Sequence, residues 1–263
     1  MTRRDEIARR IAHGAPVVAS AVAAEFEVSE DAIRRDLRAL AREGLCRRVY
    51  GGAVPLPSGS TSMATRMDDA AGRKHALALA AAKTIEPGEF IFLDNGSTNL
   101  ALARCLPGDC GLRVATNSVE IASALMQRSD IELMLLGGSV NTHVGGCVDA
   151  SAVAVLSELN VDRCFIGVCA VSAAHGLSAF EHADALFKRA LLDVSQKRSA
   201  LVLNEKFETR APHRIGRMGE ISMLVVEHDL SSELLHELQQ ARIGLLRADP
   251  DQSPISSAKA PPP

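Results

Sequence analysis

The sequence predicts an α/β protein of two domains, in which a small, mostly helical N-terminal domain precedes a larger domain built on a mostly parallel sheet. A chain of 263 residues is long enough for one small and one medium-sized domain. Apolar residues recur at helical spacing near the N-terminus, whereas short apolar strands alternate with helices after residue 74. A stretch rich in proline, serine and glycine separates the two patterns. We therefore expect a first domain at 1–54, a linker at 55–73, a second domain at 74–248 and a disordered tail at 249–263.

The composition argues against several classes of protein. Hydrophobic residues make up 47% of the chain, but no run of about 18 uncharged apolar residues is present, so we expect no membrane span. The first six residues lack the apolar core of a signal peptide, which predicts a cytoplasmic protein. The six cysteines form no C-x-x-C pair and have no zinc spacing with the eight histidines. We expect reduced, buried thiols, no metal site and no cofactor.

The first domain begins with two short helices. A T-x-x-D capping pattern begins at Thr2, apolar residues follow on one helical face, and Gly14-Ala15-Pro16 ends the helix near His13. The alanine-rich segment 19–26 predicts the second helix.

A third helix is predicted after Ser29 and carries an arginine face. Ser29 is a favourable N-cap, and Ile33, Leu37 and Leu40 repeat at helical spacing toward the other helices. Gly44 closes the helix. The arginines that point away from the apolar face are Arg34, Arg35, Arg38 and Arg42. Residues 1–50 contain ten arginines and eight acidic residues, so the placement of the arginines, more than their excess, favours nucleic acid as the partner.

A strand over residues 45–50 and the turn at Gly51-Gly52 predict a small β-wing. Three helices and a wing are typical of a winged helix-turn-helix domain, whose third helix enters the major groove of double-stranded DNA. The candidate DNA-binding residues are Ser29, Ala32, Arg34, Arg35, Arg38, Arg47, Arg48 and Tyr50. Arginine pairs with guanine or with phosphate. Periodicity alone is equally compatible with a helix face that is merely solvated.

The second domain is predicted from segments that alternate between helix and strand. The expected helices are 75–84, 99–105, 119–128, 149–159 and 182–195. The expected strands are 90–94, 112–115, 132–136, 163–168, 199–203 and 223–227. This alternation predicts a mostly parallel sheet that is covered on both faces.

Polar or glycine-rich loops follow several of these strands, at the edge of the sheet where such folds bind ligands. The candidate ligand-binding residues are Asp94, Gly96, Ser97, Thr98, Thr116, Asn117, Ser118, Gly137, Gly138 and Lys188, with Gly167 in a fourth loop. Gly96-Ser97-Thr98 opens a helix, so free backbone N–H groups and two hydroxyls would form a seat for an anion, and Lys188 would add a positive charge. The spacing is also compatible with a turn glycine, two helix caps and a solvated lysine.

Ordered motifs in both domains carry a resemblance to one family. Residues 3–54 resemble the DeoR family of regulators, and residues 66–227 resemble the sensor domain of the same family. The matching stretches are Val28-Ser29, Ile33–Leu37, Glu43–Leu45, Arg48–Ala53, Arg66 with Lys74, Leu93–Thr98, Thr116–Ser118, Leu136–Gly138, Phe165–Gly167 and Lys188–Ala190. The resemblance implies a second domain similar in fold to ribose-5-phosphate isomerase and coenzyme A transferases. It also implies two partners, operator DNA and a phosphorylated sugar or related metabolite as effector.

The chain departs from the family pattern at three places. Ala32 replaces the usual threonine, Leu203-Asn204-Glu205 stand where the family often has aspartate-x-serine before Lys-Phe-Gly, and Asp184 replaces a common glutamate. The first departure bears on operator preference, and the other two bear on the identity of the effector.

These observations predict a DNA-binding repressor of a carbohydrate-metabolism operon that forms a homo-oligomer and is released by its effector. Two alternatives stay open. One is a sugar-phosphate isomerase fused to a DNA-binding domain, with Asp94 or Asp184 as general base. No paired acidic motif follows Thr116-Asn117-Ser118, so we expect no enzymatic activity and assign no catalytic residue. The other is an α/β oligomerisation module without an effector.

Overall fold

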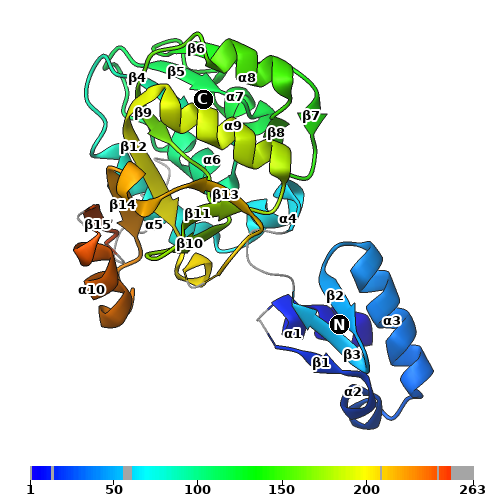
Figure 1. The fold of residues 1–263 in the computed structure, drawn as a ribbon. Helices are drawn as coiled ribbons and strands as arrows, with labels where there is room; N and C mark the ends of the chain where they lie inside the picture. The colour runs from blue at the N-terminus through cyan, green and yellow to red at the C-terminus, as the bar shows by residue number, and fades with distance from the viewer. Residues whose placement is uncertain (1, 13–14, 56–60, 208, 242, 250–263) are drawn as a thin grey trace, which may run out of the picture. The chain divides into compact units, whose positions relative to one another are not determined.

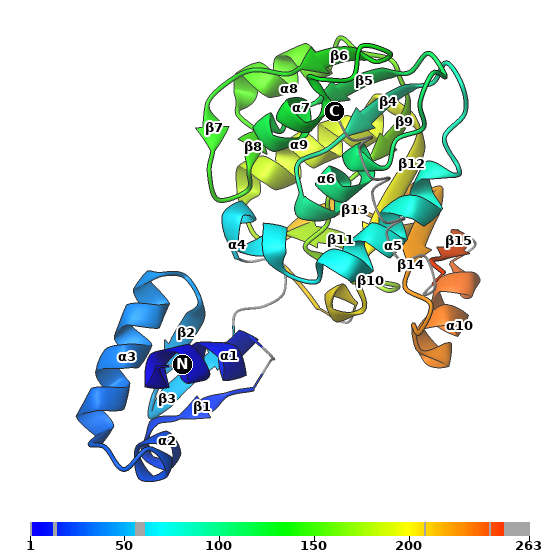
Figure 2. The same ribbon diagram turned by 180° about the vertical axis from the view of Figure 1, so that it is seen from behind.

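The structure is a computed structural model that describes residues 2–12, 15–55, 61–207, 209–241 and 243–249. The chain divides into two compact units, Met1–Thr61 and Ser62–Pro263, which Figures 1 and 2 show from opposite sides. The predicted end of the first helix at His13-Gly14 lies outside the described residues. So does the predicted tail, apart from Asp249.

The N-terminal unit contains three helices and a small antiparallel sheet, which confirms the predicted winged helix-turn-helix. The helices are α1 (Arg3–Ala12), α2 (Ala19–Glu25) and α3 (Glu30–Arg42). The strands are β1 (Val17–Val18), β2 (Cys46–Val49) and β3 (Gly52–Pro55), in the order β1-β3-β2. Strands β2 and β3 form the predicted wing, and the two-residue strand β1 was not predicted.

Local sequence signals place the third helix of this unit. The Ser29 hydroxyl accepts a hydrogen bond from the Ala32 N–H at 3.3 Å and caps α3. Gly44 follows the helix with a φ of +71°, as a glycine at that position does. Ile33, Leu37 and Leu40 are buried in the core of the unit together with Ile7 and Ile11 of α1, among others. The same periodicity that buries these residues leaves the opposite face of α3 exposed.

The C-terminal unit alternates helices and strands, as predicted. Its helices are α4 (Met63–Asp68), α5 (Ala71–Ala82), α6 (Ser97–Arg104), α7 (Val119–Leu125), α8 (Ala150–Leu156), α9 (His182–Asp193) and α10 (Ser232–Gln240), with short 3-10 turns η1 (Asn204–Lys206) and η2 (Met218–Glu220). The main-sheet strands are β4 (Phe90–Leu93), β5 (Arg113–Thr116), β6 (Glu132–Leu135), β9 (Val161–Phe165), β12 (Ser195–Val202), β14 (Met223–Val226) and β15 (Gly244–Arg247).

These seven strands form one parallel sheet in the order β15-β14-β12-β9-β4-β5-β6. From β4 the chain adds β5 and β6 on one side, and from β9 it adds β12, β14 and β15 on the other. The order therefore reverses between β4 and β9, which are paired through Phe92 and Cys164. In open α/β sheets the ligand crevice lies at such a reversal, beyond the carboxyl ends of the strands.

Helices cover both faces of the sheet, and the strands divide their side chains between two cores. Phe92 packs into the core beneath α8, α9 and α10, whereas its neighbours Ile91 and Leu93 pack into the core beneath α5, α6 and α7. Figure 1 views the sheet from the side of α9 and Figure 2 from the side of α5. Strands buried on both faces explain the continuous apolar runs in the sequence.

Several elements differ from the prediction. The expected linker 55–73 contains α4 and the beginning of α5, because Ser62 caps α4 and Met63 is buried in the core of the C-terminal unit. Helix α10 and strand β15 were not predicted. Two small antiparallel sheets were also missed, and their strands are β7 (Val140–Asn141), β8 (Gly146–Cys147), β10 (Ala170–Ser172), β11 (Gly176–Ala179) and β13 (His213–Gly216).

Candidate nucleic-acid interface and ligand site

The exposed face of α3 carries three arginines at helical spacing. Arg35, Arg38 and Arg42 follow one another at intervals of three and four residues, so they lie on one face, away from the buried Ile33 and Leu37. All three side chains are exposed. The Nε atoms of Arg35 and Arg38 make only long contacts, of 3.4 and 3.2 Å, with backbone carbonyl oxygens one turn earlier. No hydrogen bond to another described residue occupies the outer nitrogens of either guanidinium group, so these nitrogens can donate to DNA.

Arg34 differs from these three because it has acidic partners on its own helix. Its Nη2 lies 2.7 Å from Glu30 Oε2, and its Nη1 lies 3.5 Å from Asp31 Oδ1. All three side chains are exposed, and ion pairs of this kind contribute little to stability because water and salt screen them. Arg34 can therefore exchange these carboxylates for phosphate at small cost.

The wing and the start of α3 place the other predicted DNA contacts at the surface. Arg47 and Arg48 are exposed on β2, and Tyr50 projects fully into solvent at the turn before β3. Ser29 is exposed while it caps α3, and its hydroxyl hydrogen stays available for donation. Ala32 is half-buried. The structure thus brings the predicted residues onto one helix and the wing of a single unit.

In the C-terminal unit, Asp94 joins the ends of β4 and β9. It directly follows β4 and is fully buried. Its Oδ2 accepts from the Gly167 N–H at 2.7 Å, and its Oδ1 accepts from the Asn95 N–H at 2.9 Å. The Asn99 side chain strengthens the same junction by donating to the carbonyl oxygens of Asp94 and Phe165 at 2.9 and 2.7 Å. These hydrogen bonds hold the predicted ligand loop, residues 94–98, at the place where the strand order reverses between β4 and β9.

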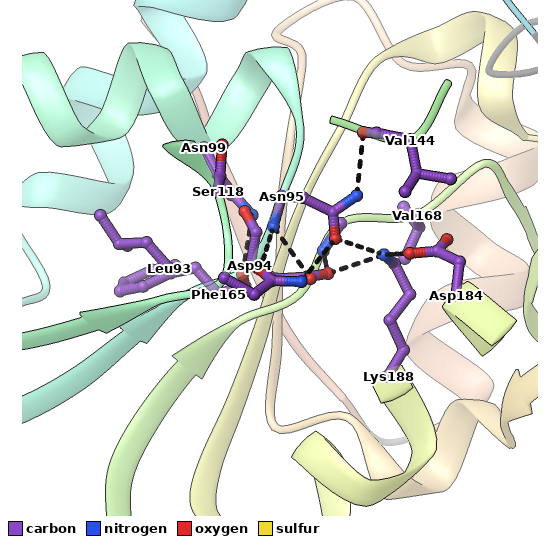
Figure 3. Close-up of polar contacts among 12 residues, drawn as sticks. Leu93, Asp94, Asn95, Asn99, Ser118, Val144, Phe165, Val168, Asp184 and Lys188 are labelled. Atoms are coloured by element: carbon purple, nitrogen blue, oxygen red, sulfur yellow. Dashed lines mark hydrogen bonds and ion pairs between the residues drawn. The ribbon is translucent and has the colours of Figure 1, made fainter. Parts of the chain in front are cut away.

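Lys188 reaches this loop from α9, as Figure 3 shows. Its Nζ forms an ion pair with Asp184, lies 3.0 Å from Asp94 Oδ2 and donates to Asn95 Oδ1 at 3.1 Å. An ammonium group has three N–H donors, so all three have acceptors inside the protein. Lys188 is buried and fully bonded, which excludes the solvated side chain that spacing alone allowed.

Burial and charge act together on this cluster. Burial raises the pKa of Asp94 to about 6, while the Lys188 ammonium opposes the shift and the Asp184 carboxylate adds to it. Burial alone would lower the pKa of Lys188, but the two carboxylates raise it above its ordinary value. Lys188 therefore stays protonated, and its charge is used to hold two buried carboxylates.

The asparagines of two loops extend the cluster across the sheet. Asn117 Oδ1 accepts from the Asn95 N–H at 3.0 Å, and Asn117 Nδ2 donates to Asn95 Oδ1 at 3.2 Å and to the Cys147 carbonyl at 3.1 Å. Asn95 Nδ2 donates to the Val144 carbonyl at 3.1 Å. Through the Cys147 thiol, which contacts the Gly138 carbonyl oxygen at 3.6 Å, Gly138 is also linked to the cluster.

Other predicted residues have structural partners. Thr116 Oγ1 donates to the Leu93 carbonyl at 2.6 Å, and Ser118 caps α7 and donates to Glu120. Gly137 is exposed, and no hydrogen bond within the described part of the chain ties it to the cluster. These hydroxyls and this glycine have no visible role in holding a ligand.

The start of α6, by contrast, has polar groups without partners. Within the described ranges, the backbone N–H groups of residues 96–99 and the hydroxyls of Ser97 and Thr98 have no hydrogen-bond partner. Both hydroxyl side chains are more than nine-tenths buried. Gly96 has a φ of +145°, and the space where a Cβ would lie is empty. The arrangement can receive a tetrahedral anion at the positive end of a helix.

The sequence did not single out Asn95 and Asn99 as site residues, and it named Asp184 as a possible general base and as a departure from the family pattern but not as a partner of Lys188, although the structure gives all three these bonds. Asn95 lies inside the predicted motif, and Asp184 precedes Lys188 by one helical turn. The spacing of four residues was an available signal for an ion pair. Among the described residues, no cluster of His, Cys, Asp or Glu is suited to a metal, and no helix is long and apolar enough to cross a membrane.

Comparison with known proteins agrees with both units. Residues 3–58 match the DeoR-like helix-turn-helix domain, and residues 69–228 match the DeoR C terminal sensor domain. The glycerol-3-phosphate regulon repressor of Escherichia coli (strain K12) is 31% identical, over 76% of this chain and 78% of that protein. The HTH-type transcriptional repressor GlcR of Bacillus subtilis (strain 168) is 28% identical, over 86% of this chain and 88% of the relative.

Among solved structures, ribose 5 phosphate isomerase A from Neisseria gonorrhoeae is similar with a TM-score of 0.40 and 18% identity, covering 55% of this chain and 56% of that one. The two domain matches together span most of the described chain and follow its division into units. The chain belongs to the DeoR family of transcriptional regulators.

Proposed function

We propose that this chain represses a carbohydrate-metabolism operon and that a phosphorylated sugar or related metabolite releases it from operator DNA. Its curated relatives include a glycerol-3-phosphate regulon repressor and a putative aga operon transcriptional repressor. The observation that carries the proposal is the start of α6, where unpartnered amides and the Ser97 and Thr98 hydroxyls lie at the reversal point of the sheet. The proposal includes a cytoplasmic site of action, where operator DNA is found.

The proposal includes the absence of catalysis. An isomerase needs a carboxylate that can take a proton from its substrate. Both oxygens of Asp94 already accept backbone N–H groups, and Asp184 is paired with Lys188. Because both carboxylates already have partners inside the protein, the site favours binding of a metabolite without its conversion. Incubation with pentose phosphates should therefore produce no turnover.

The proposal also includes self-association. A single short recognition helix reads a short site, and regulators of this kind bind two half-sites as symmetric assemblies. Strand β6 forms one edge of the main sheet, and Met134 and Leu135 on it are exposed. Val119 at the start of α7 and Met126, which caps the end of that helix, are exposed as well. An uncovered apolar edge of this kind supports a second copy as its partner. Light scattering should report a dimer or larger assembly, and Leu135→Lys should reduce its mass.

The central experiment measures release of DNA by matched ligands. An operator is first obtained by in vitro selection of double-stranded DNA on the purified chain. Aldose, ketose and polyol phosphates are then added, each beside its dephosphorylated parent. We expect a phosphate ester to release the DNA and its parent to have no effect. Release by the parent alone, or failure to select any DNA, would contradict the proposal.

Two variants link that release to the start of α6. Ser97→Ala and Thr98→Val remove one hydroxyl each and leave the volume of the side chain nearly unchanged. Both should bind operator as the wild type does and should need a higher effector concentration for release, because the lesion is confined to the ligand site. Ser157→Ala, at the end of α8, removes a hydroxyl that donates only to the Ala154 carbonyl and serves as the matched control.

A further inference from the structure

The arginine stripe on the exposed face of α3 begins with an acidic residue. Asp31 precedes Arg35, Arg38 and Arg42 by about one, two and three turns of the helix, so all four lie on the side opposite the buried residues. Arg35 Nε lies 3.4 Å from the Asp31 backbone carbonyl oxygen. Asp31 is in the first turn of α3, and the first residues of a recognition helix are those that meet base edges in the major groove. A carboxylate therefore stands at the end of the stripe that would approach the bases.

Most acidic side chains of the N-terminal unit are paired with an arginine. These paired residues are Glu6, Glu25, Glu30, Asp36 and Glu43. The Asp31 side chain is 82% exposed, and among the described residues its nearest cation is Arg34, whose Nη1 lies 3.5 Å from Oδ1. Arg34 makes its shorter contact, of 2.7 Å, with Glu30. An exposed contact as long as that of Asp31 contributes little, so the carboxylate keeps its charge and its acceptor capacity for a partner outside the chain.

The helix does not depend on Asp31 for its own start. The Ser29 hydroxyl caps α3, and Glu30 already places a negative charge in the first turn, beside the positive end of the helix dipole. A second carboxylate on the DNA-facing side repels phosphate and weakens binding to every sequence. Only a hydrogen-bond donor on the DNA offsets that repulsion.

The major groove offers such a donor on one base above all. Guanine presents two acceptors there, thymine presents an acceptor oxygen and a methyl group, and adenine presents its N6 amino group beside the N7 acceptor. Cytosine presents the N4 amino group alone. A carboxylate is repelled by each acceptor and attracted by each donor, so it discriminates for cytosine against the other three bases.

We propose that Asp31 determines operator specificity by accepting a hydrogen bond from the N4 amino group of a cytosine in the major groove. Arg35, one turn further along the same stripe, donates to a neighbouring guanine or phosphate. The inference goes beyond the proposed function because it concerns α3 alone and requires no effector.

The first experiment compares the DNA that each variant of the full chain selects from randomised duplexes at one salt concentration. Asp31→Asn should replace one selected cytosine with adenine, because an amide pairs with both N6 and N7 of that base. Asp31→Ala should lose the preference at the same position. Glu30→Gln removes the neighbouring negative charge, which lies on the side of Arg34, and as the matched control it should select the wild-type sequence. All three variants should melt near the wild-type temperature, because the altered side chains are exposed.

A second experiment removes the amino group from the DNA instead of the carboxylate from the protein. In the selected operator, the cytosine is replaced by 2-pyrimidinone, which lacks the N4 amino group, and fluorescence anisotropy measures the affinity. Wild-type protein should lose about tenfold in affinity, whereas Asp31→Ala should bind both duplexes equally.

Three results would overturn the proposal. An equal loss of affinity in wild type and Asp31→Ala would mean that the carboxylate does not contact the amino group. Tighter binding of Asp31→Ala to every sequence, with the wild-type site still selected, would leave the carboxylate only a repulsive effect on phosphate. Loss of a selected guanine instead of a cytosine would make Asp31 a positioning residue for Arg34.

Discussion

The two units of this protein hold their functional charges in opposite ways. In the N-terminal unit, Arg35 and Arg38 lie on an open helix face and make only long contacts with backbone oxygens. In the C-terminal unit, Lys188 is buried, and every donor it has is bonded to Asp94, Asp184 or Asn95. An exposed charge can be exchanged for one on a partner with little effect on stability, whereas a buried charge cannot be removed without leaving its partners unpaired.

The difference indicates where substitutions should separate binding from folding. Changes on α3 should alter affinity for DNA and leave the melting temperature unchanged. Changes in the Lys188 cluster should alter the stability of the C-terminal unit first and its response to ligand only as a consequence. Four predictions follow this division, beginning with the largest expected effect.

Lys188→Met should destabilise the C-terminal unit by about 3–5 kcal/mol, because it leaves two carboxylates facing each other without a cation in a buried site. Urea unfolding followed by circular dichroism should show the transition of that unit shifted to lower denaturant. Adding Asp184→Asn should restore part of the loss, and Lys83→Met, at an exposed position, should cost little. A change below about 1 kcal/mol in Lys188→Met would mean that water reaches the cluster.

Arg35→Ala should weaken operator binding by about 1–3 kcal/mol, the range for loss of one arginine contact to DNA. Fluorescence anisotropy of a labelled operator measures the affinity, and calorimetry should show an unchanged melting temperature. Affinity should also fall steeply with rising salt. Wild-type affinity in both Arg35→Ala and Arg38→Ala would remove this face of α3 from the DNA interface.

Ser29→Ala should lower the stability of the N-terminal unit alone by about 1 kcal/mol, the typical value of an N-cap. Ser29→Asp keeps a capping oxygen but adds a negative charge beside the DNA. It should therefore preserve stability and weaken operator binding. Thermal unfolding and anisotropy on the same samples test both effects, and equal DNA affinities for the two variants would place Ser29 away from the phosphates.

The smallest effect concerns pH. The pKa of Lys206 is lowered to about 8 by burial and by Arg66 and Lys74, while Glu205 and Cys169 oppose the shift. As pH rises through 8, Lys206 loses its proton in the folded chain but keeps it in the unfolded chain, so the stability of the C-terminal unit should increase with pH in this range. Urea unfolding at each pH measures the increase, which should be absent in Lys206→Met. An identical increase in that variant would assign the titration to another group.

The sequence predicted those features that depend on local signals. The Ser29 cap, the apolar period of α3 and the closing Gly44 placed that helix to within a residue or two, and apolar runs between turn residues placed six main-sheet strands. Strands β1, β7 and β8 were missed because two residues carry no period. The segment 55–73 was expected as a linker because it is rich in proline, serine and glycine. This composition gives no indication that Met63 is buried.

The candidate site was predicted less completely, for a different reason. The loop at Asp94–Thr98 follows an apolar strand and was identified directly. The hydrogen bonds of Lys188 to the loop depend on α9 packing beside β4, where Phe187 contacts Phe92. Contacts of this kind, between residues far apart in the sequence, depend on the strand order, and the strand order cannot be deduced from the periodicity of the sequence.

The strand order also sets the order in which the units can form during synthesis. Every strand pair of the N-terminal unit lies within residues 17–55, whereas the central pair of the main sheet joins Phe92 to Cys164. At roughly 5–20 residues per second of translation, the DNA-reading unit emerges many seconds before the strand that closes the ligand site. Long-range parallel pairing is also slower to fold than local contacts. On each ribosome, the nascent chain therefore completes the unit that binds DNA before the unit that we propose to release it.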